Sequence, residues 1–269
     1  MLLRHRRKIL CAYSFGERAM GSVAQRQLHR WVVGASGRAR SRRCRPSARP
    51  ADRRPAQAGG AATTADAFLG CVRDGRRLRL VDAVMTQNDV IVARASALFL
   101  RRSEHAVDTV WTSPVTMPAV PAEPDVLNDD VPMVFHSFGR DPVAGSPGVG
   151  IKEWRHHGQK FAWMRETKFL VDDEPLSPFT RAVMAGDVTS SLTHWGTEGL
   201  QFINADYTIT LSRLPEGVYI GLASVTHYSH AGVATGVATL FDETGPIGSG
   251  MATALSNPGF TPPPSMVVS

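Results

Sequence analysis

The sequence predicts an α+β fold in which an antiparallel sheet wraps around one central helix. One apolar helix pattern, at about residues 177–196, is followed by four strand patterns that short turns connect. A separate hairpin pattern lies upstream, with strands at about 75–86 and 90–101. A sheet curved around a single helix buries both the helix and the inner face of the sheet, so these patterns belong to one architecture.

Residues 1–65 differ from the rest of the chain in composition and charge. They are rich in Arg, Ala, Pro, Gly and Ser, and residues 1–60 carry a net charge of +13 against −7 for the remainder. Such a segment buries little apolar surface, so we expect it to be disordered. It can be interpreted as a nucleic-acid-binding tail, a transit peptide, a solvated extension or a non-native N-terminus from a misread frame. We favour the last of these interpretations. We do not expect nucleic acid as a partner, because no aromatic side chains are interleaved with the arginines.

Hydropathy and cysteine content narrow the class of protein further. No apolar run approaches the roughly 20 residues that span a bilayer, so no membrane association is expected. The three cysteines, Cys11, Cys44 and Cys71, are far apart and odd in number. They predict a reducing compartment without a disulfide framework, and hence a cytoplasmic location.

The patterns divide the chain into five parts. A hairpin at 69–102, with a turn at Gln87-Asn88-Asp89, precedes a Pro- and Asp-rich linker at 103–131. In the main domain, Ser177-Pro178 predicts the start of a helix of about 18 residues, and Gly196 its end. The remaining predictions are a main domain at 132–258, a tail at 259–269, and strands at 132–138, 160–171, 201–213, 218–230, 233–241 and 246–255.

Two stretches of the chain repeat one pattern. "TLFDETGPIGSGMATAL" (239–255) echoes "AVMTQNDVIVARASALF" (83–99), since both read as strand, polar turn and small-residue strand. In addition, "FINADYTITLSRLPEGVYIGLASV" and "ATLFDETGPIGSG" resemble motifs of the TesB-like acyl-CoA thioesterases, which are double hotdog proteins. The resemblance covers about residues 72–258. It implies a complete second hotdog and a truncated first one, because residues 1–70 do not match.

The resemblance also implies a catalytic group built on the strands after the helix. Asp206 stands at the family's water-activating position, on a strand whose alternation puts Asn204 and Asp206 on one polar face. Thr226 is the favoured hydroxyl partner, ahead of His227 and Ser229. The family's third partner is a glutamine, whose place Ala252 or Thr253 takes here. We expect Asp206, Thr226 and Thr253 to be catalytic, with weak or altered activity because the glutamine is missing.

Other polar residues complete the expected site. Asn204, Asp187 and His227 are predicted to contact substrate. Asp187 is a candidate because it lies in mid-helix, where aspartate is otherwise unfavourable. Arg213 and Lys168 are candidates for the phosphates of coenzyme A. The "RHHG" stretch at 155–158 offers no third ligand, so no metal is expected. No cofactor is expected either, because coenzyme A is the leaving group of the substrate.

The expected function is therefore hydrolysis of acyl-CoA or a related acyl thioester by an aspartate-activated water. The alternative is a non-catalytic acyl-binding or scaffold hotdog protein, which the missing glutamine and the truncated first repeat favour. Exposed sheet edges and an incomplete first hotdog predict a homo-oligomer.

Overall fold

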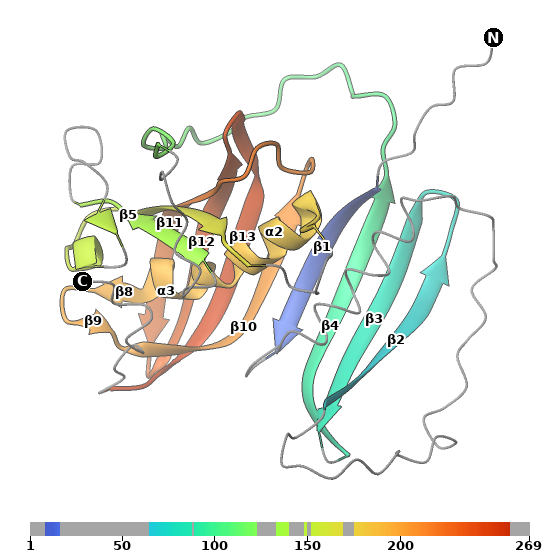
Figure 1. Ribbon diagram of the computed structural model, residues 1–269, viewed down its shortest axis with the longest axis horizontal. Helices are drawn as coiled ribbons and strands as arrows, with labels where there is room; N and C mark the ends of the chain where they lie inside the picture. Colours follow the sequence, from blue (N-terminus) through green and yellow to red (C-terminus); the bar gives the residue numbers. More distant parts are fainter. Residues whose placement is uncertain are drawn as a thin grey trace.

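One large antiparallel sheet organises the chain. The computed structural model describes residues 9–16, 65–87, 89–122, 133–139, 148–149, 152–168 and 175–258 (Figure 1). Eleven of the 13 described strands form one sheet in the order β2-β3-β4-β1-β10-β13-β12-β11-β7-β5-β6, and β8 and β9 form a separate two-stranded sheet. Helices α2 (Pro178–Gly186) and α3 (Val188–His194) pack on one face of β10–β13. This arrangement confirms the predicted hotdog fold.

The strand bounds confirm most of the predicted elements. The upstream hairpin and the four-strand meander both form, and a two-residue turn joins β11 to β12. In this turn Ala231 and Gly232 have φ angles of 48° and 81°, the pair of positive values that a type I′ turn requires. The strands are β1 Ile9–Gly16, β2 Ala65–Asp74, β3 Leu78–Gln87, β4 Val90–Arg101, β5 Met133–Ser137, β6 Gly148–Val149, β7 Phe161–Glu166, β8 Trp195–Gly196, β9 Gly199–Leu200, β10 Phe202–Leu211, β11 Ile220–His230, β12 Val233–Asp242 and β13 Gly245–Ser256.

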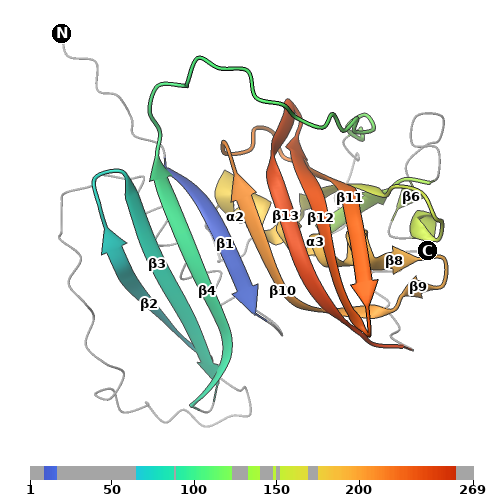
Figure 2. The ribbon, with the colours of Figure 1, turned by 180° about the vertical axis from the view of Figure 1, so that it is seen from behind.

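Five described strands were not predicted: the two-residue strands β6, β8 and β9, and the longer strands β1 and β2. Strand β1 comes from the Arg-rich segment and pairs with β4 on one side and β10 on the other, so it joins the two halves of the sheet (Figure 2). Strand β2 adds a third strand to the predicted hairpin. The remaining residues before Ala65, and the predicted tail at 259–269, lie outside the described residues. Cys71 is disulfide-bonded, which was not expected from a sequence that predicts a reducing compartment without a disulfide framework.

The central helix is interrupted where one continuous helix was predicted. The Ser177 cap is confirmed, because its hydroxyl accepts the Thr180 N–H at 3.0 Å. Asp187 is a turn residue between α2 and α3, and its N–H bonds to Ala185 O. The helix also ends before Gly196, because Trp195 is already extended and pairs with Leu200.

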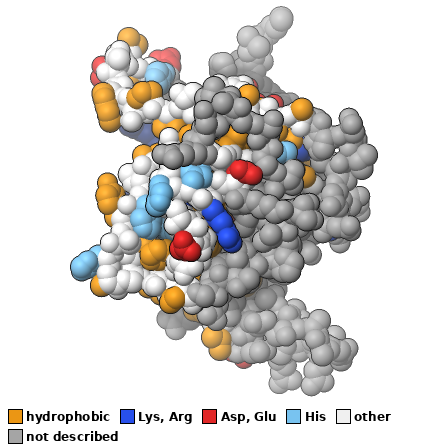
Figure 3. Space-filling view, turned by 90° about the vertical axis from the view of Figure 1, so that its left-hand side faces the viewer, with side chains coloured by type: hydrophobic (Ala, Val, Ile, Leu, Met, Phe, Trp, Pro, Cys, Tyr) orange, Lys and Arg blue, Asp and Glu red, His pale blue; other side chains and the backbone are white. Residues whose placement is uncertain are grey.

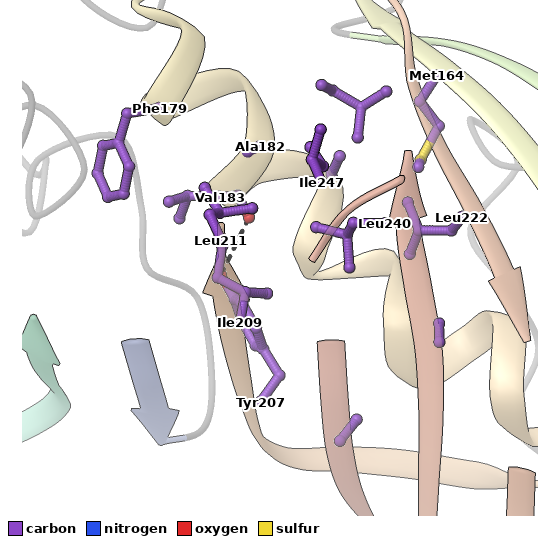
Figure 4. Close-up of a cluster of buried hydrophobic side chains, with 14 of the residues drawn as sticks. Met164, Phe179, Ala182, Val183, Tyr207, Ile209, Leu211, Leu222, Leu240 and Ile247 are labelled. Atoms are coloured by element: carbon purple, nitrogen blue, oxygen red, sulfur yellow. Dashed lines mark hydrogen bonds between the residues drawn. The ribbon is translucent and has the colours of Figure 1, made fainter. Parts of the chain in front are cut away.

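The helices lie unusually close to the sheet. A Cβ on Gly186 would approach Ile209 Cγ2 to 2.6 Å, and one on Gly236 would approach Thr193 Oγ1 to 2.3 Å. Glycine at these two positions therefore permits the close packing. Tyr207, Ile209 and Leu211 project from β10 toward α2 in the main buried cluster (Figure 4).

The predicted linker covers part of the opposite, outer face of the sheet. Residues 102–122 contain no helix or strand, yet Val115 and Met117 pack on a second apolar cluster around Trp163. The indole N–H of Trp163 donates to Pro118 O at 3.0 Å, which fixes this segment against β7. No helix in the described part of the chain is long and apolar enough to cross a membrane.

Candidate active site

A β-bulge in β10 separates Asn204 from Asp206. Asn204 pairs with Ala254 and Asp206 pairs with Thr253, so Ala205 is the extra residue. Ala254 is buried toward the helices, and Asn204 therefore lies on the helix face while Asp206 lies on the outer face. The prediction that the two share one face is wrong. Asn204 Oδ1 is buried without a hydrogen-bond partner in the described part of the chain.

The outer face brings together only two of the three predicted catalytic residues. The Thr253 hydroxyl donates a hydrogen bond to Asp206 Oδ1. Thr226 lies on β11 and pairs with Val237, and both β12 and β13 stand between β11 and β10. With a spacing of about 4.8 Å between strands, Thr226 is roughly 14 Å from Asp206. The catalytic roles of these residues stay predictions.

Asp187 lies at the helix break, above β10. The preceding residue, Gly186, contacts the ring of Tyr207, since a Cβ there would lie 3.5 Å from Tyr207 Cε2. Burial, and secondly the charge of Asp187, raise the pKa of the Tyr207 phenol well above its ordinary value. The phenol therefore keeps its proton beside the carboxyl group.

The environment of Asp187 combines access to water with partial desolvation. By surface area the residue is exposed, whereas the protein around its carboxyl group raises the pKa of Asp187 through desolvation. These two observations point in opposite directions, and the exposed area limits the size of the rise. A carboxylate that meets water and has a raised pKa can accept a proton from that water.

His194 of α3 and His227 of β11 form a hydrogen-bonded pair on the helix face. Their Nδ1 atoms are 2.8 Å apart, so one ring donates Nδ1–H and the other accepts it. The Phe202 ring contacts both, at 5.7 and 5.6 Å between centroids. His227 faces the helix because the register of β11 shifts after Ser224 and pairs His227 with Gly236. Burial, and then His227, lower the pKa of His194 to about 4.

This pair predicts acid destabilisation at mildly low pH. The folded state excludes the proton from His194, so the stability that the neutral ring contributes is complete above pH 6.5 and is lost as the pH falls toward about 4. The free energy of unfolding is measured for the wild type and for His194→Asn. The difference between the two, wild type minus variant, should fall by up to about 3 kcal/mol as the pH drops over that range. Urea unfolding at each pH measures it. The exposed His157→Asn is the control, and a pH-independent difference for His194→Asn would contradict a buried neutral ring.

The motifs that carry the family resemblance meet in one buried ion pair. Asp242 is 2% exposed, and Arg213 Nη2 donates to its Oδ1 at 2.7 Å. The N–H groups of Glu216, Thr244 and Gly245 donate to the same carboxylate at 2.7, 2.9 and 3.0 Å. Burial alone would raise the pKa of Asp242, but Arg213 and these backbone groups hold it well below its ordinary value. Arg213 is therefore engaged in the fold, whereas Lys168 is exposed.

Histidines gather on one side of the molecule. Figure 3 shows them on the face at the left of Figure 1, with acidic and basic side chains nearby. No group of three or more His, Cys, Asp or Glu side chains in the described residues is arranged to hold a metal ion. His156 Nδ1 accepts the Gly158 N–H at 2.9 Å, as expected of a local turn.

The sequence assigned no site role to Tyr207 or His194. Tyr207 looked like one apolar residue of an alternating strand, and His194 looked like the end of a helix. Only the bulge, the helix break and the register shift bring them beside Asp187 and His227. The Gly186-Asp187 pair is the one local signal, because both residues are poor helix formers.

Comparisons with known proteins agree with this fold. The sequence matches no family model and no curated protein. An acyl-CoA thioesterase II, TesB2, from Mycobacterium marinum is similar in structure with a TM-score of 0.56 and 14% identity, over 96% of this chain and 84% of that one. A TesB protein from Mycobacterium avium subspecies paratuberculosis has a TM-score of 0.52 and 12% identity, over 94% and 80%. At these identities the likeness concerns the fold alone.

Proposed function

We propose that the protein hydrolyses acyl-CoA or a related acyl thioester with a carboxylate-activated water. Two solved structures of similar fold are named as TesB proteins, one of them an acyl-CoA thioesterase II, which supports this class of reaction. The observation that carries the proposal is Asp187, an exposed carboxylate with a raised pKa at the break between α2 and α3.

The reaction requires one proton acceptor and one nucleophile. Water donates a proton to the carboxylate while its oxygen attacks the thioester carbonyl carbon. The C–S bond then breaks, the acyl group leaves as the free acid, and the sulfur leaves as a thiolate that takes up a proton. No covalent intermediate on the protein and no bound cofactor is needed, because coenzyme A enters as part of the substrate.

Two carboxylates compete for the role of base. Asp187 meets solvent beside the buried Tyr207 phenol, on the helix side of β10. Asp206, the sequence-based choice, lies on the other face and accepts a hydrogen bond from Thr253. We favour Asp187, because partial desolvation brings a carboxyl pKa closer to the pH at which the enzyme would work.

The alternative function is binding of acyl groups without turnover. It is favoured by the missing glutamine, whose place Ala252 or Thr253 takes: Ala252 is 1% exposed and supplies only a methyl group, and Thr253 has a shorter reach than glutamine. Self-association stays a prediction for either function.

Release of free thiol from a series of acyl-CoAs tests the proposal. The purified full chain is expected to release coenzyme A above the spontaneous rate with at least one acyl chain length, and to obey saturation kinetics. A protein blank without acyl-CoA corrects for the chain's own cysteines. Absence of thiol release from every acyl-CoA, together with measurable binding of one of them by calorimetry, would select the acyl-binding alternative.

A further inference from the structure

We propose that two copies of this chain associate through the part of the outer sheet face that its own linker leaves uncovered. This surface, which we call the outer patch, is centred on Tyr228, Val233, Met251 and Leu255 of β11, β12 and β13. The proposal concerns assembly, so it does not depend on the proposed function, and its test needs no substrate.

The linker covers one end of the outer face of the meander. There, Val115 and Met117 pack on the apolar cluster around Trp163. The outer patch lies toward the other end, near the turn between β11 and β12, which is the lower end of these strands in Figure 2. Its apolar side chains are exposed to solvent, by 67% at Tyr228, 56% at Val233, 48% at Met251 and 48% at Leu255.

The strands of the outer patch carry almost no charge. Strands β10–β13 contain no Lys, Arg or Glu, and their two aspartates are Asp206 and the buried Asp242. The other half of the sheet has solvated charges, such as Arg94 Nη2, which lies 3.5 Å from Asp82 Oδ2. Interface centres are depleted of charged residues and enriched in Tyr and Met, whereas a sheet face that meets water is polar. The composition of β10–β13 therefore indicates a face that another protein surface covers.

Threonines make the outer patch complementary to its own copy. Four of them point outward in the same rows as the apolar side chains: Thr208, Thr226, Thr235 and Thr253. A hydroxyl both donates and accepts hydrogen bonds, so a threonine can pair with the same residue of another copy. A face of lysines or carboxylates would instead repel its own copy. Because a two-fold interface places identical patches opposite each other, this face fits a second copy better than a partner recognised by charge.

The size of the outer patch predicts a weak dimer. Four strands spaced by about 4.8 Å, and three rows spaced by about 6.8 Å, give a surface of about 20 Å by 20 Å once side chains are included. Two such surfaces bury about 800 Å², which is below the roughly 1,200 Å² of a stable complex. We therefore expect monomer and dimer to exchange, with a dissociation constant of about 10–100 µM.

Sedimentation equilibrium of the full chain, from about 1 to 300 µM, tests the proposal. We expect the dimer fraction of the wild type to rise with concentration. Leu255→Lys should raise the dissociation constant at least about tenfold, because each copy then brings an unpaired ammonium group into the interface. Leu100→Lys is the matched control, since Leu100 is 47% exposed on β4, in the other half of the sheet. It should leave the dissociation constant within about twofold of the wild type.

Thermal unfolding checks that both variants keep the fold. If Leu255→Lys unfolds at a lower temperature than Leu100→Lys, then Val233→Lys, which changes the direct partner of Leu255 on β12, takes its place. A wild type that stays monomeric over the whole range would overturn the proposal, and so would equal dissociation constants for the wild type and the patch variant.

Salt separates the outer patch from the other surfaces that could join two copies. Residues 1–60 carry a net charge of +13 and the remainder −7, so the Arg-rich segment of one copy could attract the acidic part of another. Such an association would disappear in about 0.5 M salt, whereas apolar association should persist. Loss of the dimer at this salt concentration would therefore also overturn the proposal.

Discussion

Asp187→Asn is expected to lower kcat for acyl-CoA hydrolysis by about 10²–10⁴-fold, the usual contribution of a general base. Asparagine keeps the size of the side chain and one oxygen but accepts no proton. Asp187 is exposed, and it makes no side-chain cap for α3. The variant should therefore fold like the wild type, and KM should change little. Steady-state kinetics at saturating acyl-CoA measure the loss.

Asp206→Asn is the matched comparison, because it makes the same change on the other face of β10. We expect its kcat to stay within about threefold of the wild type, since Asp206 has Thr253 as its hydrogen-bond partner and faces away from the helices. The reverse result, a large loss in Asp206→Asn and none in Asp187→Asn, would restore the sequence-based assignment and move the active site to the outer face.

The pH dependence of the wild type gives a further check on the base. Desolvation raises the pKa of Asp187 above its ordinary value. A base must be ionised to accept a proton, so kcat should fall as the pH drops through this raised pKa. The ordinary pKa of an aspartate is near 4, and the acid limb should accordingly lie at a higher pH than this. It should disappear from the residual activity of Asp187→Asn.

The parts of the fold that local sequence determines were predictable. Short stretches of sequence determine the alternating strands, such as β10 and β11, and the turn at Ala231-Gly232. This is because side-chain alternation and turn chemistry act over a few residues. The Ser177 cap is likewise determined by a few neighbouring residues. Strand β1 was missed, because its eight residues stand in an Arg-rich segment and gain partners only from β4 and β10.

The placement of the site depended on features that local patterns do not contain. The bulge at Ala205 moves Asn204 to the helix face, and a simple alternation cannot reveal which residue of a strand will be skipped. The helix break at Asp187 accompanies the close approach of Gly186 to Ile209, which is a tertiary contact. The sequence therefore supplied the candidate residues, while the structure decided which of them share a face.

Asp242→Ala is expected to lower the free energy of unfolding by about 3–5 kcal/mol, the usual cost of removing one partner from a buried ion pair. The change leaves Arg213 without its carboxylate and removes the acceptor of the N–H groups of Glu216, Thr244 and Gly245. The Asp242 side chain is fully buried, so water cannot replace it without a rearrangement of both turns. Urea or thermal unfolding measures the loss.

Asp74→Ala is the control, because it breaks a different aspartate–arginine pair near the surface. Asp74 accepts hydrogen bonds from Arg79 at 2.9 Å, and the two side chains are 28% and 32% exposed. We expect a loss below about 1 kcal/mol there, since water hydrates the charges that remain. Equal losses in the two variants would contradict the role of burial at Asp242.

The pH dependence of the Asp242 effect follows from the lowered pKa of this carboxyl group. The unfolded chain takes up a proton at Asp242 at higher pH than the folded chain does. The stability that Asp242 contributes is therefore complete above its ordinary pKa, near 4, and is lost as the pH falls below it. The difference between wild type and Asp242→Ala should stay constant from neutral pH to about 4 and shrink in stronger acid. Since His194 loses its contribution between pH 6.5 and about 4, these two buried groups should separate into successive steps of acid unfolding.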